Sequence, residues 1–329
     1  PQRWERMNGS MHHALEPKIY QFTWAANDPA LHIQSGDRLT APARDARGFD
    51  RFGDALPDAL KQKRDGTEFQ ESNPLVGPVW VEDAEPGDML KVTIERILLD
   101  RDYAWSSLLP HFGALTGESE GRELLLNDPL PEQEYEWLMD LDAMTATLEL
   151  SRSSLKKVEI PLHPFIGSIG VAPRFARVET ALVPGEYGGN MDCVETAEGA
   201  ILYLPVWVRG AYLSFGDVHA AQGDGEMCGV ALETSAEITL KVEVLKGKTA
   251  DWPRMENETH IMVAGSARPL MNAVRIAHLE LIKWLVSDYG YDKWEAIQVH
   301  SQVGTMRVGN IVDPNYTMVA KFPKAFLPR

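Results

Sequence analysis

Short runs of alternating apolar and polar residues recur along this chain, and each run is bounded by glycine, proline or a charged turn. In "EITLKVEVL", for example, polar side chains separate Ile238, Leu240 and Val242. An alternation with a period of two predicts strands that bury one face. Because such runs occur in both halves of the chain, we expect a mainly β fold with β-sandwich or barrel-like architecture.

The apolar period changes toward the C-terminal end. In "ARPLMNAVRIAHLELIKWLVSDYG" apolar side chains recur at helical spacing, at Leu270, Val274 and Leu281, and Gly290 follows as a stop signal. This pattern predicts one long helix near residues 268–288, inside a smaller α+β part of the fold.

The strand pattern divides the chain into three parts. Residues 1–102 form a β-rich N-terminal part. Over residues 103–158 the alternation loosens, and acidic and proline-containing segments such as "NDPLPEQEYEW" interrupt it, so we expect an insertion or lid-like excursion there. Residues 159–329 form a β-rich α+β part that carries the helix and a polar site.

The charge balance argues against several classes of partner. The chain has 32 Lys and Arg against 48 Asp and Glu, a net charge of −16. Such a charge repels phosphate backbones and anionic membranes, and no apolar run is long enough to cross a bilayer. We therefore expect no nucleic-acid and no membrane partner.

The first residues show no secretory-signal pattern, so we expect a cytoplasmic protein. The apolar edges of a β-rich chain favour a homo-oligomer such as a dimer.

The stretch "FGDVHAAQGDGEMCG", residues 215–229, concentrates polar side chains among alanines and glycines. If its first part is a strand, Asp217 and His219 project from the same face, with their Cα atoms about 7 Å apart. The small residues that follow let the backbone approach a bound ion or a small substrate and bring Gln222 and Glu226 back toward it. The stretch therefore predicts a crowded polar site.

A second segment, "PGEYGGNMDC", offers another carboxylate on a loop after a glycine pair. Together with Asp217 and His219, Asp192 makes an O/O/N ligand set for a divalent metal ion, best matched by Zn²⁺, with a position left for water. Glu226 is then the nearby general base, and Glu226, Asp217 and His219 form the candidate catalytic set.

Each of these residues also has an ordinary structural alternative. An aspartate after glycine, such as Asp217, is a common turn former, and a histidine on an apolar strand is often a hydrogen-bonded interior residue. An oxygen-rich site suits Ca²⁺ and would stabilise the loops of a noncatalytic binding module. Its ligands would be Asp192, Asp217, Asp224 and Glu226, so a direct role for His219 discriminates between the two readings.

Four residues are candidates to contact a small substrate, namely Asn190, Gln222, Cys193 and His163. The side-chain amides of Asn190 and Gln222 are possible donors to an oxyanion. Cys193 lies in the acidic sequence "NMDCVET", which offers no basic neighbour to lower the thiol pKa, so we expect a buried thiol rather than a nucleophile.

Several motifs in order along the chain resemble those of the acetamidase/formamidase family. They are "GPVWVEDAEPGD", "FIGSIGVAP", "PGEYGGNMDC", "LYLPVWVRGAYLSFGDVHAAQGDGE" and "VGNIVDP". The resemblance implies a β-rich fold with a divalent metal ion and hydrolysis of a short aliphatic amide, formamide or acetamide, to the carboxylic acid and ammonia. Hydrolysis of another C–N bond or of an ester is the alternative, and the long 103–158 segment leaves the preferred amide open. Residues at positions that match the family's motifs are Asn190, Asp192, Asp217, His219, Gln222, Glu226 and Glu233.

Overall fold

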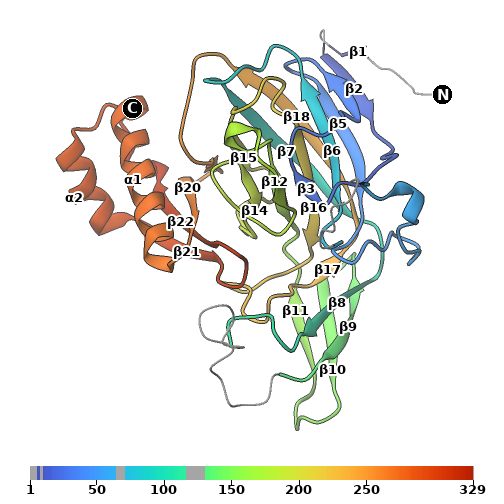
Figure 1. Ribbon diagram of the computed structural model, residues 1–329. Coiled ribbons are helices and arrows are strands. Elements are labelled where there is room, and N and C mark those ends of the chain that lie inside the picture. Colours follow the sequence, from blue (N-terminus) through green and yellow to red (C-terminus); the bar gives the residue numbers. More distant parts are fainter. Residues whose placement is uncertain (1–5, 8–9, 64–70, 116–129, 329) are drawn as a thin grey trace.

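The structure is a computed structural model that describes residues 6–7, 10–63, 71–115 and 130–328 (Figure 1). Strands dominate this part of the chain, which confirms the mainly β fold that the alternating pattern predicts. Two large sheets account for almost all of the strands.

Ten strands form the first sheet, which spans the molecule from the N-terminal strands to the C-terminal helices (Figure 1). The run "EITLKVEVL" lies in its central strand β18, where Ile238, Leu240 and Val242 are buried as expected. In spatial order the strands are β1 (Arg6–Met7), β2 (Ser10–Ala14), β5 (Arg38–Ala43), β18 (Ala236–Leu245), β7 (Met89–Leu99), β15 (Ile201–Pro205), β19 (Arg254–Glu256), β20 (His260–Ala267), β22 (Tyr316–Pro323) and β21 (Thr305–Asn310).

The second sheet also has ten strands, and its strand β16 pairs with β12, β17 and β6. Its main path is β11 (Lys156–Pro161), β10 (Thr145–Leu150), β9 (Gln133–Asp140), β8 (Tyr103–Leu108), β17 (Glu233–Thr234), β16 (Leu213–His219), β12 (Phe165–Gly170) and β14 (Gly188–Asn190). β6 (Leu75–Val81) and β4 (Leu31–Ile33) join it beside β16, and β3 (Thr23–Trp24) pairs separately with β13 (Glu179–Thr180).

The segment 103–158 builds one end of this second sheet. Its strands β8, β9, β10 and the start of β11 project below the rest of the molecule in Figure 1. Residues 116–129, within the predicted excursion, lie outside the described residues. β8 pairs with β17, so this extension is hydrogen-bonded to the strand that follows the polar stretch.

The two sheets share one hydrophobic core. Buried side chains of the first sheet, such as Ile94 and Leu240, belong to the same cluster as Phe215 and Ile169 of the second. Removing so many apolar side chains from water is the main contribution that stabilises the fold. The core also fixes the strands on which the polar site is built.

Helix α1 (Leu270–Tyr289) packs on β20 and β22 and ends at Gly290, which adopts a left-handed conformation. It confirms the helix predicted near 268–288.

A second helix, α2 (Lys293–Val303), is capped by Asp292, whose side chain accepts hydrogen bonds from the backbone N–H groups of Trp294 and Glu295. Its apolar pattern is weak because only Ala296 and His300 are buried, and for this reason the sequence pattern did not predict it. Short 3₁₀ turns cover Asp58–Leu60, Arg174–Ala176 and Lys324–Phe326.

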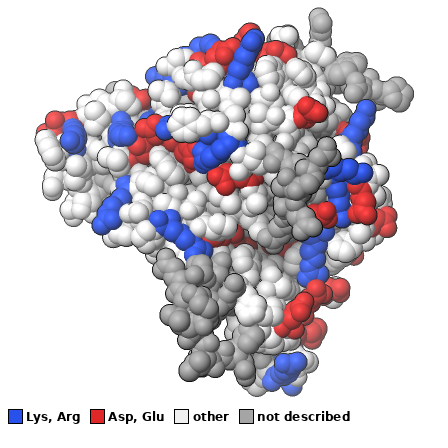
Figure 2. Space-filling model, viewed as in Figure 1, with Lys and Arg blue, Asp and Glu red and all other residues white. Residues whose placement is uncertain are grey.

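In the part of the chain that the structure describes, neither helix combines the length and the apolar character needed to cross a membrane. On the face shown in Figure 2, the described lysine and arginine side chains are interspersed with acidic ones rather than gathered into one broad basic surface.

Candidate active site

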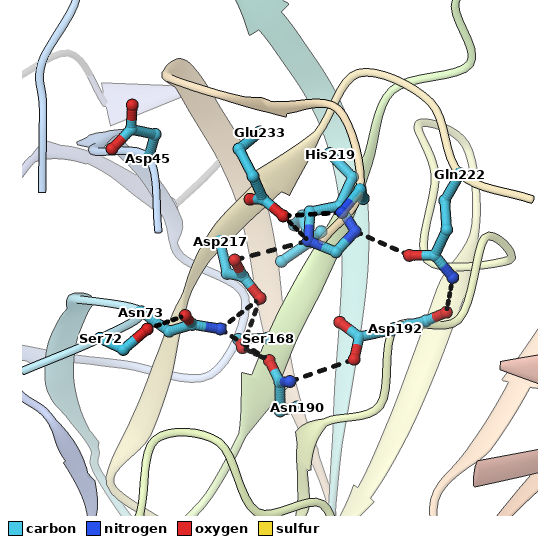
Figure 3. A network of polar contacts seen from close by, with 12 residues as sticks. Asp45, Ser72, Asn73, Ser168, Asn190, Asp192, Asp217, His219, Gln222 and Glu233 are labelled. Atoms are coloured by element: carbon cyan, nitrogen blue, oxygen red, sulfur yellow. Dashed lines mark hydrogen bonds and ion pairs between the residues drawn. The ribbon is translucent and has the colours of Figure 1, made fainter. Parts of the chain in front are cut away.

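The register of the second sheet brings the polar residues of the sequence motifs together. β16 ends at His219, which lies directly opposite Glu233 of β17. Asp217, two residues earlier on β16, and Asp192, two residues after β14, face the same space (Figure 3). One ligand atom each from Asp192, Asp217 and His219 lie within 4.8 Å of one another.

A second set of ligand atoms overlaps the first. His219, Glu226 and Glu233 also offer atoms that all lie within 4.8 Å of one another. We call the five residues Asp192, Asp217, His219, Glu226 and Glu233 the acidic cluster. Each of them is less than a tenth exposed, so His219 is surrounded by four carboxyl groups with very little water.

Three residues of the acidic cluster adopt left-handed backbone conformations. The φ angles are 48° at Asp192, 59° at Asp217 and 51° at Glu226. Such angles are uncommon for residues other than glycine and tend to concentrate at functional sites, where the surrounding structure holds them in place. Strain at three carboxylates of one cluster is therefore an indication, independent of the sequence motifs, that their placement serves a function.

The His219 ring is held in one orientation by Gln222. Gln222 Nε2 donates to the carbonyl oxygens of Asp192 and Gly309, at 2.9 and 3.0 Å, so its Oε1 accepts from His219 Nδ1 at 2.8 Å. In the neutral ring this leaves Nε2 without a proton and facing the carboxylates. The distances from His219 Nε2 to Asp217 Oδ1 and to Glu233 Oε1 are both 3.5 Å, longer than the usual hydrogen bond of about 2.7–3.2 Å.

Amide and hydroxyl groups orient the carboxylates from behind (Figure 3). Asn73 Nδ2 and Ser168 Oγ donate to Asp217 Oδ2 at 2.9 and 3.1 Å, and both also donate to Asn190 Oδ1. Asn190 Nδ2 in turn donates to Asp192 Oδ2 at 3.0 Å and to Asp313 Oδ2 at 2.8 Å. These bonds fix one oxygen of each aspartate and leave the other oxygen directed elsewhere.

Burial and mutual repulsion dominate the electrostatics of the acidic cluster. Burial, followed by repulsion from Glu226, raises the pKa of Asp192 well above its usual range. Burial likewise raises the pKa of Glu226 well above normal and that of Glu233 to about 8. For His219, burial lowers the pKa, but the Glu233 and Asp217 carboxylates more than offset it, so the net shift is upward. The cluster therefore has a strong need for positive charge.

That positive charge does not come from basic side chains. Among the described residues, the one ion-pair partner of these carboxylates is His219, and no lysine or arginine reaches them. Three buried oxygen atoms of the cluster have no hydrogen-bond donor, namely Asp192 Oδ1, Asp217 Oδ1 and Glu233 Oε2. Such atoms are costly to bury without a partner, and carboxylate oxygens around an imidazole nitrogen are what a divalent transition metal prefers.

Gly167, on β12, leaves the space in which the two aspartates meet. A Cβ atom at this position would lie 2.9 Å from Asp192 Oδ1 and 2.9 Å from Asp217 Oδ2. Any larger residue would displace a carboxylate, so the glycine is required by the close approach of these side chains.

Gly167→Ala is therefore expected to lower the free energy of unfolding by about 1–3 kcal/mol, the usual cost of overpacking. Thermal unfolding measures this effect. The control is Gly223→Ala, because a Cβ at Gly223 meets nothing within 4 Å. If the two variants unfold at the same temperature, the carboxylates do not fill the space beside Gly167.

An open cavity of about 790 Å³ lies beside the acidic cluster. Glu226 and Gln222 form part of its wall, and His163 lines it from the segment before β12. Four of the residues named from the sequence thus reach this cavity, the fourth being Asp224. Asn190, by contrast, is 3% exposed and lies behind the aspartates.

The oxyanion role considered for Asn190 and Gln222 conflicts with their hydrogen bonds. Both amide protons of Asn190 go to carboxylates, and both of Gln222 go to backbone carbonyl oxygens. Neither side chain has a proton left for a substrate oxygen. Asn190 instead contacts the Asp192 carboxylate, and Gln222 contacts the His219 ring.

The surroundings of Asp224 do not support a role as a calcium ligand, and those of Cys193 do not support contact with a substrate. Asp224 is half exposed and pairs with Arg307 at 2.5 Å rather than joining an oxygen-rich ligand set. Cys193 is fully buried, its Sγ is 3.5 Å from the carbonyl oxygen of Met191, and it is absent from the cavity wall. Burial and, after it, the Glu195 carboxylate raise the pKa of the Cys193 thiol well above its usual range.

Cys193→Ala is therefore expected to keep at least about half of the wild-type kcat/KM, because a protonated, buried thiol is a poor nucleophile. Ammonia release from an amide measures the rate, and thermal unfolding checks the fold. Complete loss of activity in a variant that unfolds like the wild type would instead make Cys193 the nucleophile.

Sequence patterns alone did not select the supporting residues. Asn73 lies just before β6 and Ser168 lies on β12, within the motif "FIGSIGVAP". No local pattern marks either residue as a hydrogen-bond donor to Asp217. Asp45 and Arg101 form a buried ion pair at 2.8 Å, and Arg101 also donates to the backbone oxygen of Glu233. Glu233 was named from the sequence only because its position matches the motifs of the acetamidase/formamidase family.

Comparison with known proteins agrees with this arrangement. The model of the acetamidase/formamidase family matches residues 28–181 and 174–327. The crystal structure of an acetamidase from Yersinia enterocolitica is 37% identical, with a TM-score of 0.84 over 97% of this chain and 94% of that one. An acetamidase from Bacillus halodurans is 29% identical, with a TM-score of 0.77 over 95% of this chain and 98% of that one.

Curated relatives match over shorter stretches. An acetamidase from Mycolicibacterium smegmatis is 39% identical over 89 residues, which cover 26% of this chain and 21% of that protein. A formamidase from Methylophilus methylotrophus is 25% identical over 294 residues, 74% of this chain and 66% of that protein. This chain thus spans less than two thirds of the length of either relative. Since the family model matches nearly all of the chain and a solved acetamidase aligns along almost its full length, the chain belongs to the acetamidase/formamidase family.

Proposed function

We propose that the protein hydrolyses a linear carboxamide to the carboxylic acid and ammonia, with a divalent metal ion held by Asp192, Asp217 and His219. The observation that carries this proposal is the buried acidic cluster itself, in which four carboxyl groups surround one imidazole, no described basic side chain compensates them, and a cavity adjoins them. Family membership supports amide hydrolysis, since relatives in the family are named acetamidase and formamidase.

The residues present fit a metal ion. Asp217 Oδ1, which has no donor, lies 3.5 Å from His219 Nε2. Asp192 offers a ligand atom to the same set and also has an oxygen without a donor, Oδ1. In the neutral His219 ring, the bond to Gln222 leaves Nε2 free to bind a metal ion. An imidazole ligand favours Zn²⁺ or a similar transition metal over Ca²⁺. The oxygen-rich alternative loses support because Asp224 pairs with Arg307 at the surface.

A divalent ion in this position supplies a Lewis acid that polarises a carbonyl group and acidifies water. The protein residues provide the proton transfers and the orientation. Glu226, at the boundary between the acidic cluster and the cavity, accepts a proton from the attacking water and returns it to the departing nitrogen. Over the whole reaction, the water oxygen forms a bond to the carbonyl carbon and the C–N bond breaks. One water proton is transferred to the leaving nitrogen, which departs as ammonia, and the other remains with the carboxylic acid.

The remaining residues keep these groups in place. Gln222 fixes the tautomer of His219, and Asn73 with Asn190 fixes one oxygen of each aspartate. Supporting groups of this kind commonly contribute 10- to 100-fold to metal affinity or activity, as an order-of-magnitude figure.

Ammonia release from formamide, acetamide and longer amides, measured beside hydrolysis of the matching esters, tests the proposal. We expect amide hydrolysis that stops after chelation and returns when metal is added back. If the protein hydrolyses only esters, it is an ester hydrolase and not an amidase. If the metal-loaded protein hydrolyses neither, a noncatalytic ion-binding module is favoured.

A further inference from the structure

The cavity beside Glu226 is far larger than formamide or acetamide requires. Its volume is about 790 Å³, within the range of about 300–1,000 Å³ that is typical of pockets for drug-sized ligands. Acetamide has four non-hydrogen atoms and fills on the order of 100 Å³, since one water molecule occupies about 30 Å³. A substrate of that size would leave most of the cavity to water.

The wall of the cavity is mainly apolar and comes from two parts of the fold. Trp137 of β9 and Ile160 of β11 line the cavity from strands at the end of the second sheet that the extension builds. Val230 and Leu232, which follow the polar stretch, also line it, and Met227 adds an exposed thioether. The binding of an apolar group against such a wall is favourable because apolar surface is removed from water, whereas a polar group contributes little binding free energy there.

The one arginine of the described wall is already paired with carboxylates. Arg307 is bound by Asp224 at 2.5 Å and by Glu195 at 3.1 Å. Glu226 belongs to the acidic cluster and is assigned to proton transfer. In the described lining, therefore, no arginine or lysine is available to bind an anionic substituent. Together with the mainly apolar wall, this favours an uncharged group in the cavity.

We propose that the preferred substrate is a primary amide with an apolar acyl group substantially larger than acetyl, whose chain lies along Trp137 and Ile160 while its carboxamide reaches Glu226. This inference rests on the proposed amide hydrolysis and narrows its substrate class. It gives the strand extension a role, because that extension supplies one wall of the acyl site.

The first test is a chain-length series. Ammonia release by the metal-loaded protein is measured for formamide, acetamide, butanamide, hexanamide and phenylacetamide. Each methylene transferred from water to an apolar wall is expected to raise kcat/KM about fourfold until the cavity is filled. Hexanamide is therefore expected to exceed acetamide by about 100-fold or more.

The second test uses the wall itself. Trp137→Ala removes a large apolar side chain and is expected to lower the ratio of kcat/KM for hexanamide to that for acetamide by about tenfold. Ile160→Ala, a smaller change on β11, is expected to lower the ratio by about threefold, and it serves where the tryptophan variant fails to fold. The matched control is Leu138→Ala, because Leu138 is the next residue of β9, is 60% exposed and does not line the cavity. It should leave the ratio unchanged.

The outcomes separate this inference from the proposed function. Hydrolysis confined to formamide and acetamide, or a hexanamide-to-acetamide ratio that is the same in Ile160→Ala and the wild type, would overturn the inference and leave amide hydrolysis standing. Failure to hydrolyse any amide, long or short, would overturn both.

Discussion

His219→Ala is expected to lower kcat/KM for amide hydrolysis by about 10³-fold, more than the 10- to 100-fold typical of residues that only support a ligand. The His219 ring is the one nitrogen donor among the carboxylates of the acidic cluster, and its Nε2 lies 3.5 Å from both Asp217 Oδ1 and Glu233 Oε1. Without it, a transition metal loses its preferred ligand, and the remaining carboxylates repel one another. Metal content, measured on the same preparation, should fall together with the rate.

The matched control is His300→Ala. His300 is also a buried histidine, 6% exposed, but it lies on α2 against His278. This variant is expected to keep metal and most of its activity even where its thermal stability falls. If His219→Ala retains metal and turns over substrate like the His300 variant, His219 is a structural residue.

Glu226→Gln is expected to lower kcat by about 10²- to 10⁴-fold, the usual contribution of a general acid–base residue, while metal content stays near that of the wild type. Glutamine preserves the volume of the side chain but neither accepts a proton from water nor returns one to the leaving nitrogen. Because Asp192, Asp217 and His219 remain, the proposed ion keeps its ligands. Steady-state kinetics together with metal analysis separates the two effects.

Glu280→Gln provides the comparison for this variant. Glu280 is a buried glutamate on α1, 4% exposed and paired with Lys283 at 2.6 Å, and its amide variant should keep its rate. A Glu226→Gln rate close to that of the Glu280 variant would move the general base elsewhere in the acidic cluster, with Glu233 the next candidate.

Half-buried strands such as β18 and helix α1 were predictable because each has a local periodic signal. Alternation marks β18, and helical spacing with a terminal glycine marks α1. Helix α2 has no comparable signal, since only Ala296 and His300 of its residues are buried. Its beginning depends on the Asp292 cap, which is short and common in sequences.

Part of the acidic cluster was predictable for the same reason. Asp217 and His219 are two residues apart on one strand, and the strand period of two predicts that they share a face. The left-handed φ of Asp217 departs from regular strand geometry and was not predictable. The position of Glu233 opposite His219 depends on the pairing of β16 with β17, and the bonds from Asn73 and Ser168 depend on the packing of β12 and the segment before β6. These are contacts between distant parts of the chain, and no local pattern encodes them.

The left-handed conformations of Asp192, Asp217 and Glu226 could not be read from the sequence either. Aspartate tolerates this region better than most residues, but the preference is too weak to locate individual sites. Asp217 adopts it on strand β16, whereas Asp192 and Glu226 adopt it outside the strands, so the conformation depends on the surrounding tertiary structure.

The most direct test of the account is a crystal structure of the purified protein with diffraction data collected on both sides of a metal absorption edge. We expect one anomalous peak within the acidic cluster, bonded to Asp192, Asp217 and His219 Nε2, with Glu226 free to face the cavity. A cluster without a peak, in crystals of protein that hydrolyses an amide at full rate, would contradict it.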